Sequence, residues 1–435
     1  MAGGVALLLT SLPAAAEDLL DIYERALDAD PALLAARHDH QSVRERLRAA
    51  WAELLPVLSF EYQRTRTRQE IRASDNRVFA AGTTTFPVEE WTASAVLPVI
   101  HVDNFVRLPQ ARAEMRRSDF ELAEAEQDLI FRVAEAYFGV LAARDNLEYA
   151  RAEREAIGLQ LEEAESRVGA GLSTVEDLYD ARARHATALA TEADAEDLLA
   201  DRLRAVEEII GQAVGELHRL RAEIRLSTPE PADAGAWVEA SLEGNPSLAA
   251  LREAVQVARK ETLRVASGHA PTVDLVGSVN RRDTEGSLFG GGSDVETTDL
   301  LLRVQVPLFQ APTLFETREA HFQAKRARQD MIREQRRVER ETRAAYLGVR
   351  TQVARVEALA RSVLAQQRAL EVKQEGLKAG LNTGLDVLDA RRDLFLARRD
   401  HDQARYDYIL ETLRLKRLAG SLDLADLAEV NRLLE

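Results

Sequence analysis

The stretch Ala136-Tyr137-Phe138-Gly139-Val140 recurs 209 residues later as Ala345-Tyr346-Leu347-Gly348-Val349. Gly171-Leu172 returns as Gly380-Leu381 at the same separation. Three further pairs of identical residues have the same offset: Asp177 and Asp386, Asp180 and Asp389, and Gly211 and Gly420. A constant offset between several separate motifs is typical of an internal duplication. The sequence therefore predicts two copies of one structural unit.

The boundaries of the two copies follow from the repeats and from proline. The first copy is expected to cover residues 17–225 and the second residues 235–420, with a C-terminal segment at 421–435. Residues 226–234 contain two prolines and are predicted to be the linker between the copies. Upstream of the strands the offset is 215 instead of 209, so the first copy carries six extra residues in a loop.

Apolar residues along each copy follow the period of long helices. Leu129, Val133, Ala136 and Val140 are spaced four, three and four apart, and a second stripe beginning at Ile130 runs beside them. A helix with two adjacent seams can contact a neighbour on each side. Four helices are predicted, at about 104–168, 174–211, 313–377 and 384–419.

Four short segments alternate between apolar and polar residues, the period of a strand with two unlike faces. They lie at about 56–66, 88–98, 271–282 and 297–307. Leu58 and Phe60 share one face of the first segment, and Leu300, Leu302 and Val304 share one face of the last. Loops are expected between the members of each pair, the first from Thr65 to Thr85. Such strands can cross a bilayer, but four are too few to close a membrane barrel, so several copies would have to share one.

Composition excludes several classes of protein. The chain has 435 residues, no cysteine and a formal charge of −16. It can form no disulfide or thiolate metal site. The acidic balance argues against nucleic acid as a partner. No phosphate-binding Gly-Lys motif and no catalytic constellation is present, and the eight histidines are scattered. We expect no enzyme activity, no cofactor and no intrinsic metal.

The N-terminus resembles an export signal. Val5–Leu9 is a short apolar core, and the small residues of Leu12–Ala16 precede Glu17 as a leader-peptidase site requires. The basic residues that normally precede such a core are missing. Residues 1–16 are therefore expected to be a cleaved signal-peptide remnant, with the true start lying upstream. The other interpretation is an apolar N-terminus of a cytosolic protein.

The order and spacing of these features resemble the TolC family of outer-membrane efflux and type I secretion channels. The motifs that carry the resemblance are Asp30-Pro31-Ala32-Leu33, Asn245-Pro246-Ser247-Leu248, Ala136-Tyr137-Phe138, Gly171-Leu172 and Asp386-Val387-Leu388-Asp389-Ala390. The resemblance implies a mainly α fold with a β-barrel portion. As a homotrimer, the chain would form a 12-stranded barrel in outer-membrane lipid, continued by a periplasmic α-helical barrel. It also implies a periplasmic adaptor and an inner-membrane transporter of the RND, ABC or MFS type.

The resemblance assigns roles to the turns between long helices. Asp386 and Asp389 would line the periplasmic entrance as acidic rings that can bind a blocking cation, and Asp177 and Asp180 are further entrance candidates. The same two pairs also suit helix capping, which by itself accounts for Asp177 and Asp386. The exposed turns would contact the adaptor through four residues: Gly171, Leu172, Gly380 and Leu381.

Two positions depart from the family pattern. Asn382 stands where family members often carry Arg, and Leu377 stands where some carry Tyr. The family's closing contacts therefore cannot be transferred to this chain. The function expected is passive export of drugs or secreted proteins. The alternative is a soluble coiled-coil scaffold with hairpin inserts, and the cargo is not encoded in any motif.

Overall fold

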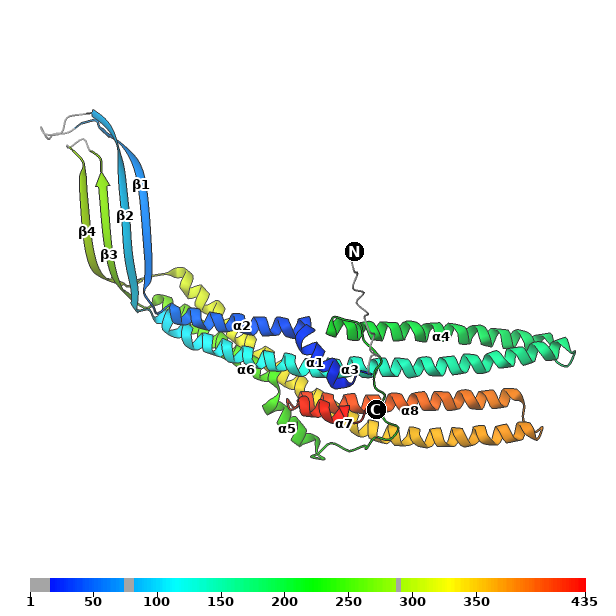
Figure 1. Cartoon of the computed structure of the whole chain (residues 1–435). Coiled ribbons are helices and arrows are strands. Elements are labelled where there is room, and N and C mark those ends of the chain that lie inside the picture. The colour runs from blue at the N-terminus through cyan, green and yellow to red at the C-terminus, as the bar shows by residue number, and fades with distance from the viewer. Residues whose placement is uncertain (1–15, 74–81, 287–290) are drawn as a thin grey trace, which may run out of the picture. The chain divides into compact units, whose positions relative to one another are not determined.

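The computed structural model describes residues 16–73, 82–286 and 291–435 (Figure 1). The apolar core of the predicted signal segment lies outside the described residues. The helices are α1 (Leu19–Ala29), α2 (Pro31–Ala52), α3 (Val102–Gly169), α4 (Val175–Ile210), α5 (Ala234–Gly244), α6 (Pro246–Ala266), α7 (Ala311–Lys378), α8 (Gly384–Leu418) and α9 (Leu424–Asn431), with a 3-10 helix η1 at Ser267–His269. The strands are β1 (Val57–Ile71), β2 (Gly82–Ile100), β3 (Thr272–Thr284) and β4 (Ser293–Gln305).

The predicted duplication is confirmed by the order of the elements. The series α2, β1, β2, α3, α4 recurs as α6, β3, β4, α7, α8. Both long helices, α3 and α7, have 68 residues. None of the helices within the described ranges carries an apolar stretch long enough to traverse a lipid bilayer.

The chain divides into two compact units. One contains the described residues up to His38 together with Phe120–Ala249 and Ile332–Glu435. The other contains Asp39–Asp119 and Ala250–Met331, and it holds all four strands. Each long helix contributes residues to both units.

Helix α2 begins at the Asp30-Pro31 motif. Proline suits the first helical position because the missing N–H would lack an intrahelical acceptor there. The Asp30 carboxylate accepts the Leu33 N–H at 2.7 Å and two guanidinium N–H groups of Arg132 at 2.9 and 3.0 Å. Asp30 is only 2% exposed, and its bonds to Arg132 lower its pKa. The motif is therefore a helix cap tied to α3.

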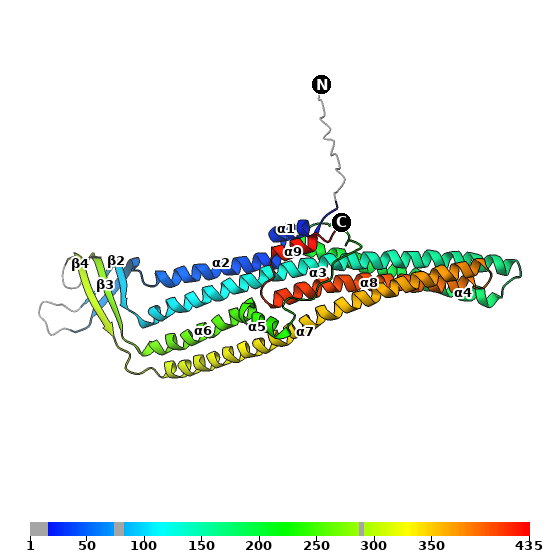
Figure 2. The ribbon, with the colours of Figure 1, turned by 90° about the horizontal axis from the view of Figure 1, so that it is seen from below.

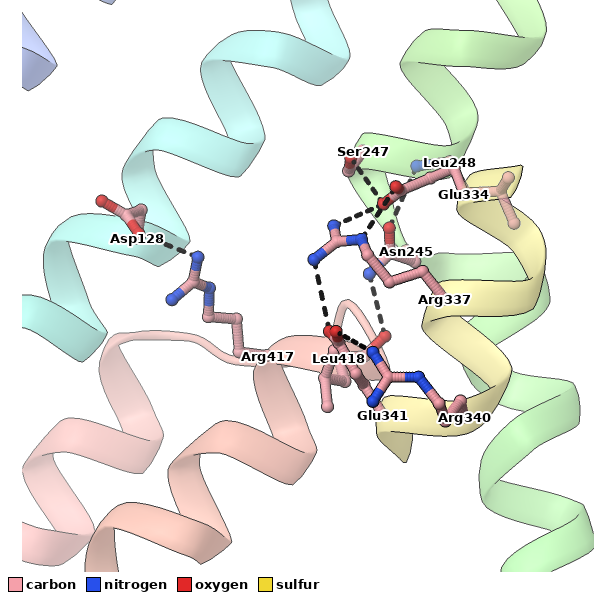
Figure 3. Close-up of polar contacts among 10 residues, drawn as sticks. All are labelled: Asp128, Asn245, Ser247, Leu248, Glu334, Arg337, Arg340, Glu341, Arg417 and Leu418. Atoms are coloured by element: carbon pink, nitrogen blue, oxygen red, sulfur yellow. Dashed lines mark hydrogen bonds and ion pairs between the residues drawn. The ribbon is translucent and has the colours of Figure 1, made fainter. Parts of the chain in front are cut away.

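Helix α6 begins in the same manner at Asn245 (Figure 3). The side-chain Oδ1 of Asn245 accepts the Leu248 N–H at 3.0 Å, and its side-chain Nδ2 donates to the Leu418 backbone carbonyl at 3.1 Å. Nearby, Arg337 donates to Glu334 at 2.5 and 2.8 Å. The duplicated motif thus joins the start of each short helix to a longer helix.

The core of the first unit lies along the two seams predicted for α3. Leu129, Val133 and Val140 of the first seam are buried, and Tyr137 and Leu141 of the second are 0% and 1% exposed. The core includes aromatic contacts, with the ring centroids of Phe138 and Tyr406 5.6 Å apart. Two adjacent seams allow α3 to pack against partners on both sides.

The strands form one antiparallel sheet in the order β1-β2-β3-β4. Residues paired across the ladders lie on the same face. One row of paired residues reads Leu58, Ala95, Gly277 and Leu300, and the next row reads Ser59, Ser94, Ser278 and Asp299. The Ser59 and Ser94 hydroxyls are 2.7 Å apart. The alternation in the sequence therefore identified the two faces.

The predicted loop from Thr65 to Thr85 is too long. Strand β1 continues to Ile71, which pairs with Gly82 of β2. The residues added to the ladder are mostly polar. Ladder hydrogen bonds join backbone groups and need no apolar side chain, so periodicity alone does not reveal where such a hairpin ends.

The helices of the second unit lie in the same order as the strands (Figure 2). The His40 imidazole on α2 is 2.8 Å from Asp119 on α3. Arg116 on α3 donates to Glu253 on α6 at 2.7 Å. In η1, which follows α6, a Cβ on Gly268 would lie 3.2 Å from the Thr313 methyl group of α7, so the glycine permits this close approach. The order is therefore α2, α3, α6, α7, and the two outer helices are α2 and α7.

Candidate functional site at the helix turns

The turn between α3 and α4 is closed by backbone hydrogen bonds around one glycine. Leu172 N–H donates to the Arg167 carbonyl at 2.8 Å, and Gly171 N–H donates to the Val168 carbonyl at 3.0 Å. This pair of bonds is a Schellman motif. Gly171 has φ +72°, a left-handed conformation that costs other residues about 1–2 kcal/mol. The predicted turn glycine is therefore required by the backbone.

The turn between α7 and α8 has the same geometry. Leu381 N–H donates to the Gly376 carbonyl at 2.8 Å, and Gly380 N–H donates to the Leu377 carbonyl at 3.1 Å. Gly380 has φ +71°. The duplication therefore extends to the individual hydrogen bonds of the two turns.

Both turns leave a leucine in solvent. Leu172 is 71% exposed and Leu381 is 82% exposed. A side chain at this position of a Schellman motif usually contacts an apolar residue in the preceding helical turn. Here Arg167 and Gly376 occupy that place, so neither leucine gains the usual apolar contact. Each turn therefore presents one exposed apolar side chain, Leu172 in the first and Leu381 in the second.

Each following helix starts with a capping box. The Thr174 hydroxyl accepts the Asp177 N–H at 3.2 Å, and the Asp177 carboxylate accepts the Thr174 N–H at 3.1 Å. Thr383 and Asp386 make the equivalent bonds at 3.2 and 2.8 Å. These bonds favour the charged carboxylate. The hydroxyl of Ser173 holds the pKa of Asp177 below its usual range, and the hydroxyl of Thr383 does the same for Asp386.

Asp386 and Asp389 lie together on the free side of α8. Val387 and Ala390 are buried, whereas Asp386 is partly exposed and Asp389 is exposed. Residues three apart share a helical face. The structure thus keeps this pair of acids next to each other and in contact with solvent.

Asp177 and Asp180 have a different environment. They line a groove of about 300 Å³ whose other wall is Thr383–Leu385 at the start of α8. At Gly384 an added Cβ would lie 3.6 Å from the Glu163 carboxylate of α3. The groove thus lies between the turn that follows α3 and the start of α8, and Asp177 and Asp180 border it.

Asn382 is engaged within its own turn. Its amide donates to the Lys373 carbonyl at 3.3 Å. A Cβ on Gly376 would lie 2.3 Å from the same amide nitrogen, so the side chain fits because residue 376 is glycine. Leu377 is 42% exposed. The sequence analysis noted that Asn382 differs from the family pattern, but it missed the role of Gly376. The indication in the sequence is that Gly376 replaces Arg167, the equivalent residue of the first repeat.

Sequence analysis also missed a partly buried hydrogen-bond network between α3 and α8. The Tyr149 hydroxyl donates to Asp402 at 2.7 Å, and the Tyr406 hydroxyl donates to Asp145 at 2.6 Å. Burial raises the pKa of Asp145. The partners are 253 and 261 residues apart, so no local pattern could have indicated them. This network joins the two helical hairpins.

The sequence of this chain matches a known protein family in both repeats. A family model described as "Outer membrane efflux protein" matches residues 22–212 and 237–421, one segment in each repeat. The chain is 34% identical over 421 residues to the outer membrane protein TolC of Vibrio cholerae, covering 96% of this chain and 93% of that protein. It is 30% identical over 427 residues to the alkaline protease secretion protein AprF of Pseudomonas aeruginosa, covering 98% and 89%.

Solved structures share the fold at lower sequence identity. The CmeC outer membrane channel of Campylobacter jejuni superposes with a TM-score of 0.82 at 15% identity, covering 96% of this chain and 90% of that chain. VceC of Vibrio cholerae gives 0.75 at 19% identity, covering 92% and 96%. With family matches in both repeats and relatives similar over nearly the whole chain, the protein belongs to the outer membrane efflux protein family and is an outer-membrane channel protein, not an enzyme or a soluble scaffold.

Proposed function

We propose that three copies of this chain assemble edge to edge into one channel through the outer membrane. The observation that carries the proposal is the open sheet. Its outer strands, β1 and β4, each pair on one side only within the described residues. Joining β4 of one copy to β1 of the next continues the antiparallel alternation. Three copies, the number that the family resemblance implies, give about twelve strands, within the range of bacterial barrels.

The apolar face of the sheet supports a lipid-facing surface. Leu58, Phe60, Leu300 and Leu302 are 78%, 70%, 79% and 61% exposed in the single chain. Exposed apolar surface of this kind usually meets a partner or a membrane. In the proposed barrel these side chains contact outer-membrane lipid, and the row containing Ser59, Ser94 and Ser278 faces water.

The helix turns are the proposed periplasmic entrance. Three copies bring together three Asp386 and three Asp389 carboxylates. The Asp386 carboxylate is charged at neutral pH, and its lowered pKa extends the charged state to more acidic pH. Rings of carboxylates favour cations and can hold a blocking multivalent ion. Asp177 and Asp180 are a second, weaker candidate for an entrance ring, because they border the groove whose other wall is the start of α8.

The exposed leucines are the proposed contact with a periplasmic adaptor. Leu172 and Leu381 stand on glycine turns at the ends of rigid helices, which suits a docking tip. The sequence contains no phosphate-binding Gly-Lys motif of a nucleotide hydrolase. In the proposed system, energy for transport comes from an inner-membrane transporter behind the adaptor. The names of the relatives suit either efflux or secretion, and the proposed cargo is a drug or a secreted protein.

A direct test is export in cells that lack their own channel of this family. The chain should restore export when it is expressed with its adaptor and transporter. A variant with Leu172→Asp and Leu381→Asp should reach the outer membrane in normal amounts and fail to restore export. Full export by this variant would show that the tips do not dock the adaptor.

A further inference from the structure

The apolar face of β1 becomes basic toward the hairpin that joins β1 to β2. Residues two apart on a strand lie on the same face. Beyond Phe60, this face of β1 carries Tyr62, Arg64, Arg66 and Arg68. Tyr62 pairs with Trp91 of β2, so an aromatic row separates the apolar part of the face from the basic part. Aromatic rows of this kind mark the edge of the lipid-facing band in membrane barrels.

Two of the three arginines have no acidic partner among the residues that the structure describes. Arg66 and Arg68 are exposed, and their cross-strand partners on β2 are the uncharged Pro87 and Thr85. Arg64 differs, because its guanidinium lies 3.2 Å from the Glu89 carboxylate. Two guanidinium groups therefore remain available to a ligand.

The acids nearest to Arg66 and Arg68 are distant or already paired. Glu285 is level with Pro87, to whose carbonyl its N–H donates at 3.3 Å. It therefore lies two strands from Arg66, about 9–10 Å away at ordinary strand spacing. Glu70 follows Arg68 on the same face, and its carboxylate accepts a bond from Arg72 at 3.1 Å. The basic patch is thus not neutralised by the described part of its own chain.

The basic patch lies at the end of the sheet away from the helices (Figure 1). The chain enters β1 from α2 and leaves β2 into α3, so the hairpin is at the opposite end. The helices of this outer-membrane channel protein extend into the periplasm, so the hairpin end faces the outside of the cell. Arg66 is four residues beyond Tyr62, about 13 Å along the strand. Arginine side chains can extend back along an apolar surface to reach the polar headgroups.

We propose that Arg66 and Arg68 bind a phosphate group of a lipid in the outer leaflet of the outer membrane. The inference rests on the proposed assembly, because lipid meets this face only if the sheet is part of a barrel. A guanidinium presents a planar pair of donors that matches two phosphate oxygens. The two arginines are about 7 Å apart along β1, so both can reach one headgroup. The whole chain has a formal charge of −16, so this basic patch contrasts with the rest of the protein.

The test compares two forms of one lipid on the full-length trimer in mild detergent after removal of bound lipid. The probes are bisphosphorylated lipid A and the same lipid after enzymatic dephosphorylation, and native mass spectrometry counts the molecules bound. The unchanged protein should prefer the bisphosphorylated form at least about tenfold, because charge-assisted bonds to the phosphates are the expected source of affinity. Equal binding of the two forms would refute the inference without any variant.

Variants then assign the binding to the two arginines. Arg66→Gln with Arg68→Gln should weaken binding of bisphosphorylated lipid A at least about tenfold, since the charged donors are lost. The matched control is Arg282→Gln, which removes an exposed guanidinium from the opposite face of the same sheet. It should change binding by less than about twofold, because that face does not contact lipid. An equal loss in the control would reduce the effect to overall charge and contradict the assigned patch.

Other occupants of the patch give different results. If the arginines pair with acids on β4 of a neighbouring copy, the double variant should lower the yield of trimer while each remaining trimer binds lipid A normally, which would refute the inference. Displacement of lipid A by millimolar inorganic phosphate would indicate a site for free anions and equally refute it. A trimer that binds no lipid A leaves the proposed assembly intact, whereas a monomer in all mild detergents would contradict the assembly itself.

Discussion

Removing the Tyr406 hydroxyl tests whether the partly buried network between α3 and α8 holds the two helical hairpins together. Tyr406 is 5% exposed, and its hydroxyl donates to Asp145 at 2.6 Å. In Tyr406→Phe the Asp145 carboxylate keeps its burial and loses this donor. A hydrogen bond to a charged group contributes about 1.5–3 kcal/mol, so the free energy of unfolding should fall by that amount at pH 8.

The pH dependence of this loss has a definite sign. Burial holds the pKa of Asp145 above its unfolded value, with Asp402 and Glu148 adding repulsion and Arg219 opposing them. Stability from the neutral carboxyl is therefore complete below the unfolded pKa and is lost as pH rises through the folded pKa. The variant raises the folded pKa further. Its deficit should be largest at pH 8 and should shrink to about 1 kcal/mol in acid, where only a neutral hydrogen bond is missing.

The measurement is guanidinium unfolding of the detergent-solubilised protein at several pH values. The control is Tyr346→Phe, which is similarly buried at 4% exposed and has no hydrogen-bonded carboxylate among the described residues. The control should show a smaller, pH-independent change. Equal losses for both variants at every pH would refute the role assigned to the Tyr406–Asp145 pair.

Three further changes probe the entrance, the lipid face and a turn. Asp386→Asn with Asp389→Asn should weaken block by multivalent cations at least tenfold in planar bilayers, and unchanged block would place these acids outside the conducting path. Leu302→Asp should impair assembly in the outer membrane, at a cost of about 2 kcal/mol per chain near mid-membrane, and normal assembly would contradict the assigned face. Gly380→Ala should lower the stability of the turn by about 1–2 kcal/mol because of its positive φ, while Gly169→Ala should not, as measured by local hydrogen exchange.

The repeats and periodicities in the sequence identify most of the fold. The 209-residue offset predicts the duplication, the seams on α3 predict its buried faces, and alternation predicts the two faces of the sheet. Each of these signals is local or repeats at a fixed distance. The two strands of the first hairpin extend further toward their connecting loop than the alternation predicts, because the added polar residues pair through the backbone alone.

The candidate site was predictable only in part. The turns could be predicted from Gly171 and Gly380 and from the capping pairs that follow them. A left-handed backbone conformation favours glycine, and the first turn of a helix favours acidic residues. The fit of Asn382 over Gly376 depends on how one side chain folds back, and the Tyr149–Asp402 bond depends on packing between distant segments. Neither leaves a periodic signal. The separate surroundings of Asp177 and Asp386 likewise arise from packing, because their local motifs are alike.

The central claim is that three polypeptides complete one membrane cylinder that none of them can form alone. Electron cryo-microscopy of the detergent-purified, full-length protein measures this most directly. The account predicts a hollow particle with threefold symmetry, twelve strands around one wall, and β4 of each copy beside β1 of the next. A closed sheet within one copy, or particles without threefold symmetry, would contradict it.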